Sequence, residues 1–467
     1  MYQINFNNPI KVHFIGIGGI SMSGLAEQLH TMKFVISGSD AKSSKITTHL
    51  ESLGITVMYG QRGSNITDDI DLVVYTAAIK SDNEEYQEVL KRNIPMIDRA
   101  ELVGQVMLNY TNSIAVSGTH GKTTTTSMIS LILLEGNLDP TISVGGILEN
   151  IHGSIRIGQS ETYITEACEY TNSFLKFKPT KSIILNVEAD HLDFFKDIDD
   201  IRNSFRLFAN ELPDDGLLIV NNEIPNVSYF TESLPCEVIT YGVNDTVSTA
   251  PNATKHYSAV NITYNEYGHG SYDLLENGVF QTRIELSVVG IHNISNSLPS
   301  IALGLNLNIP ISVIKDALLL YKGTDRRFQK KGEIGGVTII DDYAHHPTEV
   351  AATLTAAKNY PHNDIWCVFQ PHTYTRTKAF LKEFAEALTG ADKIIVADIY
   401  AAREKDTLNI SAKDLVDELV NLGKEAYYIS SFNEIEKFLL QHCTNGDLLI
   451  TMGAGDIVSI GESILGL

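Results

Sequence analysis

The chain has 467 residues, 43% of them hydrophobic, and a formal net charge of −22 at pH 7. This length predicts two to four domains, and the hydrophobic content is that of an ordinary globular protein. The negative charge argues against a nucleic-acid polymer or an anionic membrane as the main partner, whereas a small anionic ligand needs only a local positive site.

The start of the chain lacks the basic segment of a signal peptide, and glycines interrupt the apolar run that follows. No apolar run reaches the length of a membrane span. Four scattered cysteines lack metal-ligand spacing, which favours reduced thiols: Cys168, Cys236, Cys367 and Cys443. We therefore expect a cytoplasmic protein with no membrane partner.

The first segment, residues 1–110, alternates apolar strands with helices, which predicts a Rossmann-like domain with a parallel sheet. The expected strands are 12–15, 34–36 and 72–75, and the first expected helix is 20–32. A glycine-rich turn, Gly16-Ile17-Gly18-Gly19, joins the first strand to this helix. Ser21 stands where a strict dinucleotide fingerprint has glycine, and Asp40 lies where an acid would meet a ribose. A bound nucleotide and a tight turn without a ligand both fit, and NAD fits less well than another diphosphate.

The second segment, residues 111–322, opens with a nucleoside-triphosphate loop, Gly118-Thr119-His120-Gly121-Lys122-Thr123-Thr124. An apolar strand precedes it and an apolar helix, 128–134, follows. Backbone N–H groups and the helix N-terminus favour phosphate there, with Lys122 on the β- and γ-phosphates and Thr123 on Mg²⁺. The alternative is a Gly/Thr-rich turn without a ligand. We expect a central ATPase of P-loop type with a mixed sheet.

Two polar clusters follow apolar strands of this segment, at 166–169 and 188–191. In an open α/β sheet this edge binds ligands, so Glu166 and His191 are the candidate Mg²⁺ ligands. A surface acid and a helix-capping histidine are the alternatives. The remaining acids of the clusters are expected to be solvated or in the outer shell: Glu169, Glu188 and Asp190. Beside these acids Cys168 is not expected to be a nucleophile.

Residues 245–285 predict an antiparallel excursion, and a helix opens near 290 and runs to about 305. Asn293 and Asn296 lie three apart on one face of this helix. They could hold a purine edge or a ribose, or serve only as helix caps.

The third segment, residues 323–467, predicts a further Rossmann-like α/β unit. A helix is expected over 378–388, ended by Gly390, and another is expected to start at Ser411 with Asp414 three residues on. Five strands are expected, at 337–340, 365–369, 393–397, 426–429 and 448–451. Arg326 and Arg327 at the boundary could close onto phosphates or form a solvated basic pair.

Two loops of this unit carry polar groups after successive strands. One loop holds Tyr343, His345 and His346, and the other holds His372 and Arg376. Together they predict a site for a small carboxylate, with Arg376 as the anchoring cation.

These motifs, in this order, resemble the Mur ligase family over essentially the whole chain. Besides the two glycine-rich loops, the resemblance is carried by 188–191, His292-Asn293 with Asn296, 326–328, 342–349, and Gln370-Pro371-His372 with 374–376. The first turn and the two His-containing C-terminal motifs point to the branch that adds alanine. The resemblance implies a UDP-sugar domain, a central ATPase and an amino-acid domain. It implies that L-alanine is joined to the lactyl carboxylate of UDP-N-acetylmuramate through an acyl phosphate, in cell-wall peptidoglycan synthesis.

Residue by residue, the resemblance implies four groups. The UDP-sugar residues are Gly16, Gly18, Gly19, Asp40 and Thr76. The ATP residues are Gly118 to Thr124 with Asn293, Asn296 and Arg327. The Mg²⁺ ligands are Thr123, Glu166 and His191. The residues facing alanine are Tyr343, His345, His372 and Arg376. Catalysis is implied for Lys122, Glu166, His191, Asp342 and His345, with His345 as a hypothetical proton acceptor.

The chain departs from the family pattern at Thr373, where relatives often have a second arginine. Residues 204–208 hold no lysine of the kind that several sister ligases carbamylate, which fits the alanine-adding branch. Three alternatives remain at this point: a sister ligase for a recycled tripeptide or another amino acid, a non-catalytic nucleotide-binding protein, and an NAD-dependent oxidoreductase. We expect a monomer or a homodimer.

Overall fold

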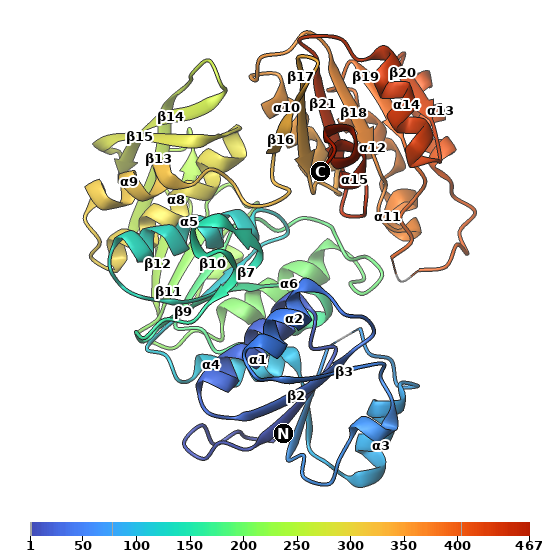
Figure 1. Ribbon diagram of the computed structural model, residues 1–467. Helices are drawn as coiled ribbons and strands as arrows, with labels where there is room; N and C mark the ends of the chain where they lie inside the picture. The colour runs from blue at the N-terminus through green and yellow to red at the C-terminus, as the bar shows by residue number, and fades with distance from the viewer. Residues whose placement is uncertain (1, 77, 403) are drawn as a thin grey trace.

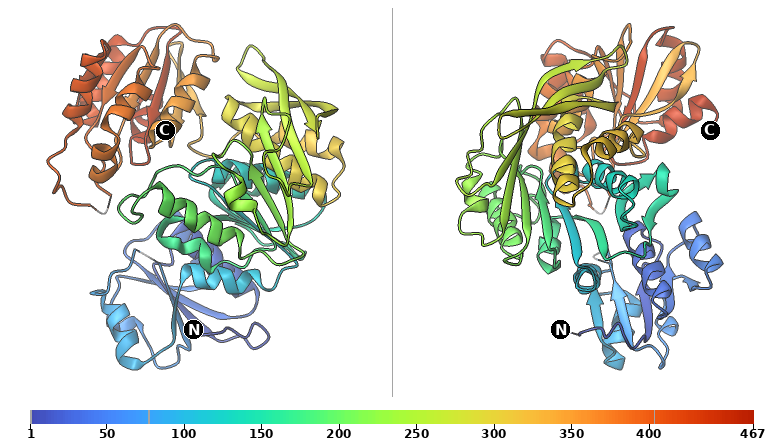
Figure 2. Two further views of the ribbon diagram at one scale, coloured as in Figure 1. Left: turned by 180° about the vertical axis from the view of Figure 1, so that it is seen from behind. Right: turned by 90° about the vertical axis from the view of Figure 1, so that its left-hand side faces the viewer.

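The computed structural model describes residues 2–76, 78–402 and 404–467. Three sheets follow one another along the chain, and each is packed with its own helices (Figure 1). In Figures 1 and 2 the N-terminal domain lies at the bottom of the molecule, the central domain lies above it, and the C-terminal domain lies beside the upper part of the central domain. The predicted fold class, three α/β domains, is confirmed. Within the described residues, no helix combines the length and apolarity that crossing a membrane requires.

The N-terminal domain is a five-stranded parallel sheet in the order β3-β2-β1-β4-β5. Its strands are β1 (Lys11–Ile15), β2 (Val35–Asp40), β3 (Thr56–Tyr59), β4 (Leu72–Tyr75) and β5 (Met96–Asp98). Its helices are α1 (Ile20–Thr31), α2 (Lys45–Ser52), η1 (Gly63–Asn65), α3 (Glu84–Arg92) and α4 (Arg99–Met107). Asp98 caps α4 in a capping box with Glu101, which fixes where the last helix begins.

The central domain has a ten-stranded mixed sheet in the order β15-β14-β13-β12-β11-β10-β6-β9-β7-β8. Its strands are β6 (Asn112–Ser117), β7 (Thr141–Leu148), β8 (Gly153–Arg156), β9 (Thr162–Ala167), β10 (Lys181–Ile184), β11 (Leu217–Asn221), β12 (Glu237–Val243), β13 (Lys255–Tyr264), β14 (His269–Glu276) and β15 (Val279–Val289). Its helices are α5 (Lys122–Glu135), η2 (Glu149–Ile151), η3 (Tyr170–Lys176), α6 (Ile198–Ala209), α7 (Ser228–Thr231), α8 (Ile291–Asn306) and α9 (Ile311–Leu320). Strand β6 pairs in parallel with β9 on one side and β10 on the other, so the loop after β6 opens at a switch point of the sheet.

The C-terminal domain has a six-stranded sheet in the order β16-β17-β21-β18-β19-β20, parallel except for the edge strand β16. Its strands are β16 (Gln329–Ile334), β17 (Val337–Asp342), β18 (Ile365–Phe369), β19 (Lys393–Val396), β20 (Glu425–Tyr428) and β21 (Leu448–Met452). Its helices are α10 (Pro347–Ala357), α11 (Tyr374–Ala379), α12 (Leu381–Leu388), α13 (Ala412–Asn421), α14 (Phe432–His442) and α15 (Val458–Leu465). The loops after β17, β21 and β18 therefore leave neighbouring strands at one edge.

Most of the expected elements are present. The antiparallel excursion is confirmed as β13, β14 and β15, and the Ser411–Asp414 capping box starts α13. One expected helix is wrong, because 378–388 is split at Phe380, whose backbone (φ −119°, ψ 27°) ends α11 and precedes α12. Two strand ends also differ: Glu166 lies inside β9 rather than after it, and β10 ends at Ile184 rather than near 187.

Candidate active site

The phosphate loop joins β6 to α5, and its lysine is the first residue of that helix. Lys122 Nζ donates to the backbone oxygens of Gly118 and Thr119 and to Glu169 Oε2 at 3.2 Å. Burial alone would lower the pKa of Lys122, but Glu169, Cys168 and Glu166 outweigh it and raise that pKa. The ammonium is therefore held charged over the loop.

Glu166 is held beside the loop by two donors. Its Oε2 accepts a hydrogen bond from Thr123 Oγ1 at 3.1 Å, and its Oε1 accepts one from the backbone N–H of Gly145. A carboxylate and a hydroxyl oxygen thus face each other at the start of α5, and both are oxygen ligands of the kind that Mg²⁺ prefers.

His191 lies in a loop with φ +52° and caps no helix, so its expected alternative as a capping residue is wrong. Its Nε2 is 3.7 Å from Glu169 Oε1, a buried oxygen without a hydrogen-bond partner among the described residues. Burial lowers the pKa of His191, which leaves the imidazole neutral and able to coordinate a metal. Glu169, which we expected to be solvated or in the outer shell, is buried and links Lys122 to His191, so it is not solvated and the outer-shell alternative stays open.

A cavity of about 510 Å³ opens between the central and C-terminal domains, within the usual range for ligand pockets. Seven of the residues predicted to bind ATP or act in catalysis line it: His120, Gly121, Thr124, Asn293, Asn296, Arg327 and Asp342. Gly290 rather than either asparagine is the N-cap of α8. The side chain of Asn293 instead donates to Val289 O at 2.8 Å, and that of Asn296 donates to Asn293 Oδ1 at 3.3 Å.

Arg326 and Arg327, in the hinge segment that joins the central and C-terminal domains, have different surroundings. Arg326 donates to Asp341 Oδ2 at 2.9 Å and to the backbone oxygens of Gly453 and Gly455, so it fastens the hinge to the C-terminal sheet. Arg327 instead lines the cavity, 3.9 Å from Glu349.

Asp342 ends β17 and accepts hydrogen bonds from the backbone N–H groups of Phe328 and Ala344, at 2.7 and 2.8 Å. Burial raises its pKa to about 6. Its carboxylate thus holds the hinge backbone as well as facing the cavity.

A second cavity of about 610 Å³ lies against the loop 190–193 and is lined by His191, His372, Thr373 and Arg376. Arg376 donates from Nε and Nη2 to Asp190 Oδ1, at 3.2 and 2.9 Å, and from Nη1 to His372 Nδ1 at 3.2 Å. Although burial opposes it, this guanidinium lowers the pKa of Asp190. Asp190 is therefore an interdomain ion-pair partner and not a solvated acid, while its contact with His191 at 3.8 Å leaves the expected outer-shell position open.

The two C-terminal loops meet at His345 and His372, whose ring centroids are 5.6 Å apart. His372 also stacks on Tyr400, and Tyr343 packs edge-on against His345. His345 Nδ1 contacts Tyr343 O at 3.0 Å, which leaves a lone pair on Nε2 when Nδ1 carries the proton. Burial lowers the pKa of His345 to about 3, so the imidazole is neutral at physiological pH.

Glu349 is a central residue that the sequence did not single out as a site residue. It accepts hydrogen bonds from His120 Nδ1 at 3.1 Å and from the backbone N–H of His345 at 3.0 Å. Burial alone would lower the pKa of His120, but Glu349 and Glu188 raise it to about 9. The sequence feature that could have indicated Glu349 is its spacing from His345, four residues apart at the start of a helix.

In the N-terminal domain, the glycine-rich turn leads into α1, with Gly19 as its N-cap. Asp40 Oδ2 accepts a hydrogen bond from the backbone N–H of Gly18 at 2.9 Å. A Cβ built on Gly16 would lie 2.9 Å from Thr76 Cγ2. The structure thus gathers the five predicted UDP-sugar residues around one turn.

Comparison with known families accounts for all three domains. Family models described as "Mur ligase family, catalytic domain", "Mur ligase middle domain" and "Mur ligase, glutamate ligase domain" match residues 11–111, 116–304 and 326–455. A curated relative from Lachnoclostridium phytofermentans is 64% identical over the whole of both chains. The chain belongs to the Mur ligase family.

Individual Mur ligases give the finer comparison. The Lachnoclostridium phytofermentans protein and one from Lachnospira eligens, 57% identical over the whole of both chains, are both named UDP-N-acetylmuramate–L-alanine ligase. A crystal structure titled as UDP-N-acetylmuramate-alanine ligase from Thermotoga maritima has a TM-score of 0.81 and 29% identity, and the match covers 98% of each chain. A murein peptide ligase from Psychrobacter arcticus has a TM-score of 0.72 at 23% identity, which shows a shared fold.

Proposed function

We propose that this Mur ligase joins L-alanine to the lactyl carboxylate of UDP-N-acetylmuramate at the expense of ATP, a step of peptidoglycan precursor synthesis. The observation that carries the proposal is that one short loop serves both cavities. Glu188 lines the first cavity beside the phosphate loop, while Asp190 and His191 line the second. A phosphoryl donor in the first cavity and an amine in the second would thus meet at this loop. The relatives' printed names supply the substrates.

We assign the nucleotide to the first cavity, with its phosphates on Gly118–Thr124 and its nucleoside near Asn293, Asn296 and Arg327. Thr123 and Glu166 offer two neighbouring oxygens to a magnesium ion. We assign His191 as its third ligand, a neutral imidazole whose Nε2 lies 3.7 Å from the unpartnered oxygen of Glu169. Bound there, Mg²⁺ would offset negative charge on the phosphoryl oxygens. Lys122 supplies a second positive charge at the same place.

We assign the alanine carboxylate to Arg376. A guanidinium has five N–H donors, and Asp190 and His372 take three of those of Arg376. The remaining two can hold a carboxylate, while Asp190 fixes the guanidinium plane. Tyr343, His345 and His372 would then surround the bound amino acid.

In the proposed reaction, a lactyl carboxylate oxygen attacks the γ-phosphorus of ATP, ADP leaves, and an acyl phosphate forms. The alanine nitrogen then attacks the acyl carbon, and phosphate leaves with the former carboxylate oxygen. Separate domains that hold the two reactants can orient them for reaction, and orientation can lower the activation free energy by up to about 10 kcal/mol.

We assign the proton lost from the attacking nitrogen to Nε2 of His345. Its imidazole is neutral, with Nδ1 held by Tyr343 O, so Nε2 is free to accept a proton. Because the low pKa makes it a weak base, the transfer belongs after the C–N bond begins to form, when the nitrogen becomes acidic. If His345→Ala raised the alanine KM but left kcat and its pH profile unchanged, the role as base would be wrong.

The UDP part of the substrate is assigned to the N-terminal turn, at Gly16, Gly18, Gly19, Asp40 and Thr76. Asp40 already holds Gly18 N–H, so the ribose would have to share its carboxylate. Since ATP and UDP-sugars are made in the cytoplasm, we propose that the chain works there. We propose a monomer or a homodimer.

The test is mass analysis of the product formed from ATP, Mg²⁺, UDP-N-acetylmuramate and one acceptor at a time: L-alanine, glycine, L-serine or the recycled tripeptide. We expect the alanyl amide to form with the highest kcat/KM and Lys122→Ala to form none. Preference for the tripeptide would instead identify the sister ligase. No amide with any acceptor would contradict the ligase assignment.

A further inference from the structure

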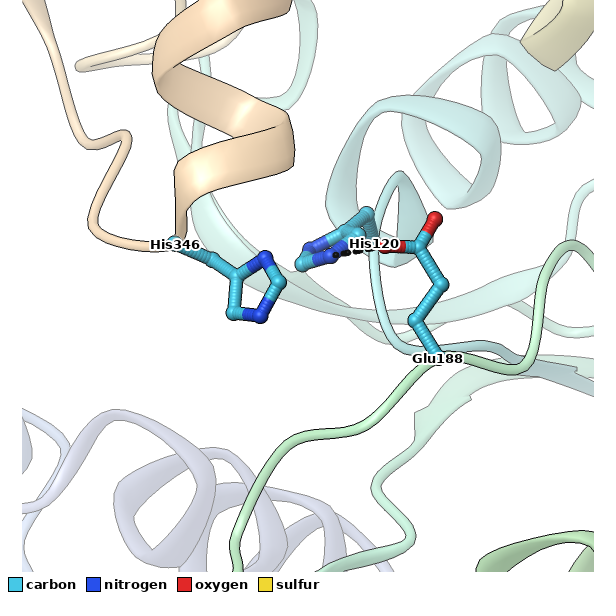
Figure 3. Close-up of side chains that lie close together, drawn as sticks. All are labelled: His120, Glu188 and His346. Carbon is cyan, nitrogen blue, oxygen red and sulfur yellow. Dashed lines mark ion pairs between the residues drawn. The ribbon is translucent and has the colours of Figure 1, made fainter. Parts of the chain in front are cut away.

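Three metal-binding side chains from distant parts of the chain converge beside the phosphate loop (Figure 3). His120 belongs to that loop, Glu188 to the loop after β10, and His346 to the N-cap of α10 in the C-terminal domain. One ligand atom of each lies within 4.8 Å of the others. None of the three is among the ligands assigned above to Mg²⁺.

The imidazole of His120 is oriented from behind by a carboxylate. Its Nδ1 lies 3.1 Å from Glu349 Oε1, while its Nε2 is buried, without a hydrogen-bond partner among the described residues, and 3.6 Å from Glu188 Oε2. Histidines that bind metals usually donate their other N–H to a carboxylate or a carbonyl oxygen. With Nδ1–H on Glu349, Nε2 is the nitrogen left to bind a metal ion, and it lies on the side of Glu188.

His346 is oriented in the matching way. Its Nε2 lies 3.2 Å from Ala189 O, so this nitrogen donates and Nδ1 carries the lone pair. The ring edge that carries both nitrogens of His346 is turned toward His120 in Figure 3, and the two ring centroids are 4.8 Å apart. A long contact of 3.4 Å with the N–H of Thr348 competes for Nδ1.

We propose that His120, Glu188 and His346 bind a divalent transition-metal ion of the Zn²⁺ type between the central and C-terminal domains. Two imidazole nitrogens and one carboxylate oxygen form a common zinc ligand set, whereas Mg²⁺ prefers oxygen ligands. Glu349 and Ala189 O orient the two rings. The ion takes the place of a proton on His120 and ties the two domains together. His120 and Glu188 also line the first cavity. Metal binding by these three residues does not require that the chain be a ligase.

The test is titration of the full-length chain, free of nucleotide, with Co²⁺ as a spectroscopic substitute for Zn²⁺. We expect the visible absorption of four-coordinate Co²⁺, abolished by Zn²⁺ and unchanged by excess Mg²⁺. His346→Gln should weaken binding by more than about tenfold, while His442→Gln, at an exposed histidine of the same domain, should not change it.

His346→Cys separates a ligand from a structural residue. A thiolate at position 346 that binds Co²⁺ adds a sulfur-to-metal charge-transfer band in the near ultraviolet, which a merely structural side chain would not produce. Unchanged binding in His346→Gln, a signal lost only in His191→Gln, or no charge-transfer band in a folded His346→Cys would each overturn the proposal.

Discussion

Arg376 of the C-terminal domain and Asp190 of the central domain form a buried ion pair across the domain boundary, with two nitrogens on one carboxylate oxygen at 3.2 and 2.9 Å. They are 186 residues apart in the chain. The pair joins the phosphate-loop domain to the cation that we assign to the alanine carboxylate. Domain position and amino-acid binding are thus coupled through one contact.

Asp190→Asn should raise the KM for L-alanine by roughly tenfold or more, because removing one partner of a buried pair leaves the other uncompensated at a cost of about 3–5 kcal/mol. The KM for ATP should stay within about twofold, since Asp190 does not line the first cavity. Steady-state kinetics measure both. Asp364→Asn, which breaks the more exposed pair with Lys393, is the matched control. Equal effects on the two KM values would contradict the assignment.

Gly121→Ala should weaken ATP binding by at least about tenfold, because its Cβ would lie 2.5 Å from Asn296 Oδ1 in the cavity wall. Its φ of +84° adds strain of about 1–2 kcal/mol. Gly54→Ala is the control, with φ +88° but no atom within 4 Å of the new Cβ. Calorimetric titration with ATP should separate them. Equal ATP affinities of the Gly121→Ala and Gly54→Ala variants would mean that the contact with Asn296 does not affect ATP binding.

Thr373→Gly should stabilise the C-terminal domain by about 1 kcal/mol, because φ +66° with ψ 145° is a conformation that essentially only glycine adopts without strain. Thr389→Gly, at an ordinary φ of −59°, should lower stability. Thermal unfolding midpoints measure both. A lower midpoint for Thr373→Gly would show that its backbone is not strained.

Asp342 should make the wild-type chain less stable as the pH rises from about 4 to about 6. Its pKa is raised to about 6 by burial, so between these values the folded state binds more protons than the unfolded state, and stability falls with increasing pH. Over the whole window the free energy of unfolding should fall by about 3 kcal/mol. The midpoint of Asp342→Asn relative to wild type should therefore rise over this window. A constant difference would mean that Asp342 ionises normally.

The sequence was sufficient for the architecture and for the local motifs. Lys122 begins a helix after a glycine-rich turn, and Thr123 lies beside Glu166, as strand, loop and helix predict. Such motifs can be recognised in a sequence because a few consecutive residues form the whole phosphate-binding loop.

Contacts between residues far apart in the chain were not predictable from the sequence. For Glu169 and Asp190 the sequence left a solvated and an outer-shell position open, because their partners, Lys122 and Arg376, lie far away in the chain. The break at Phe380 was also hidden, since apolar periodicity reports which face is buried and not whether the helix axis continues. Phe380 packs edge-on against His346, a contact that no local pattern encodes.

The most direct test of the account is phosphate release from ATP and Mg²⁺, measured with UDP-N-acetylmuramate and L-alanine together and with each alone, the lactyl carboxylate being labelled with heavy oxygen. We predict steady release only when both are present, with one labelled oxygen in each phosphate. Equal release without UDP-N-acetylmuramate or without L-alanine, or unlabelled phosphate, would contradict an acyl-phosphate ligase.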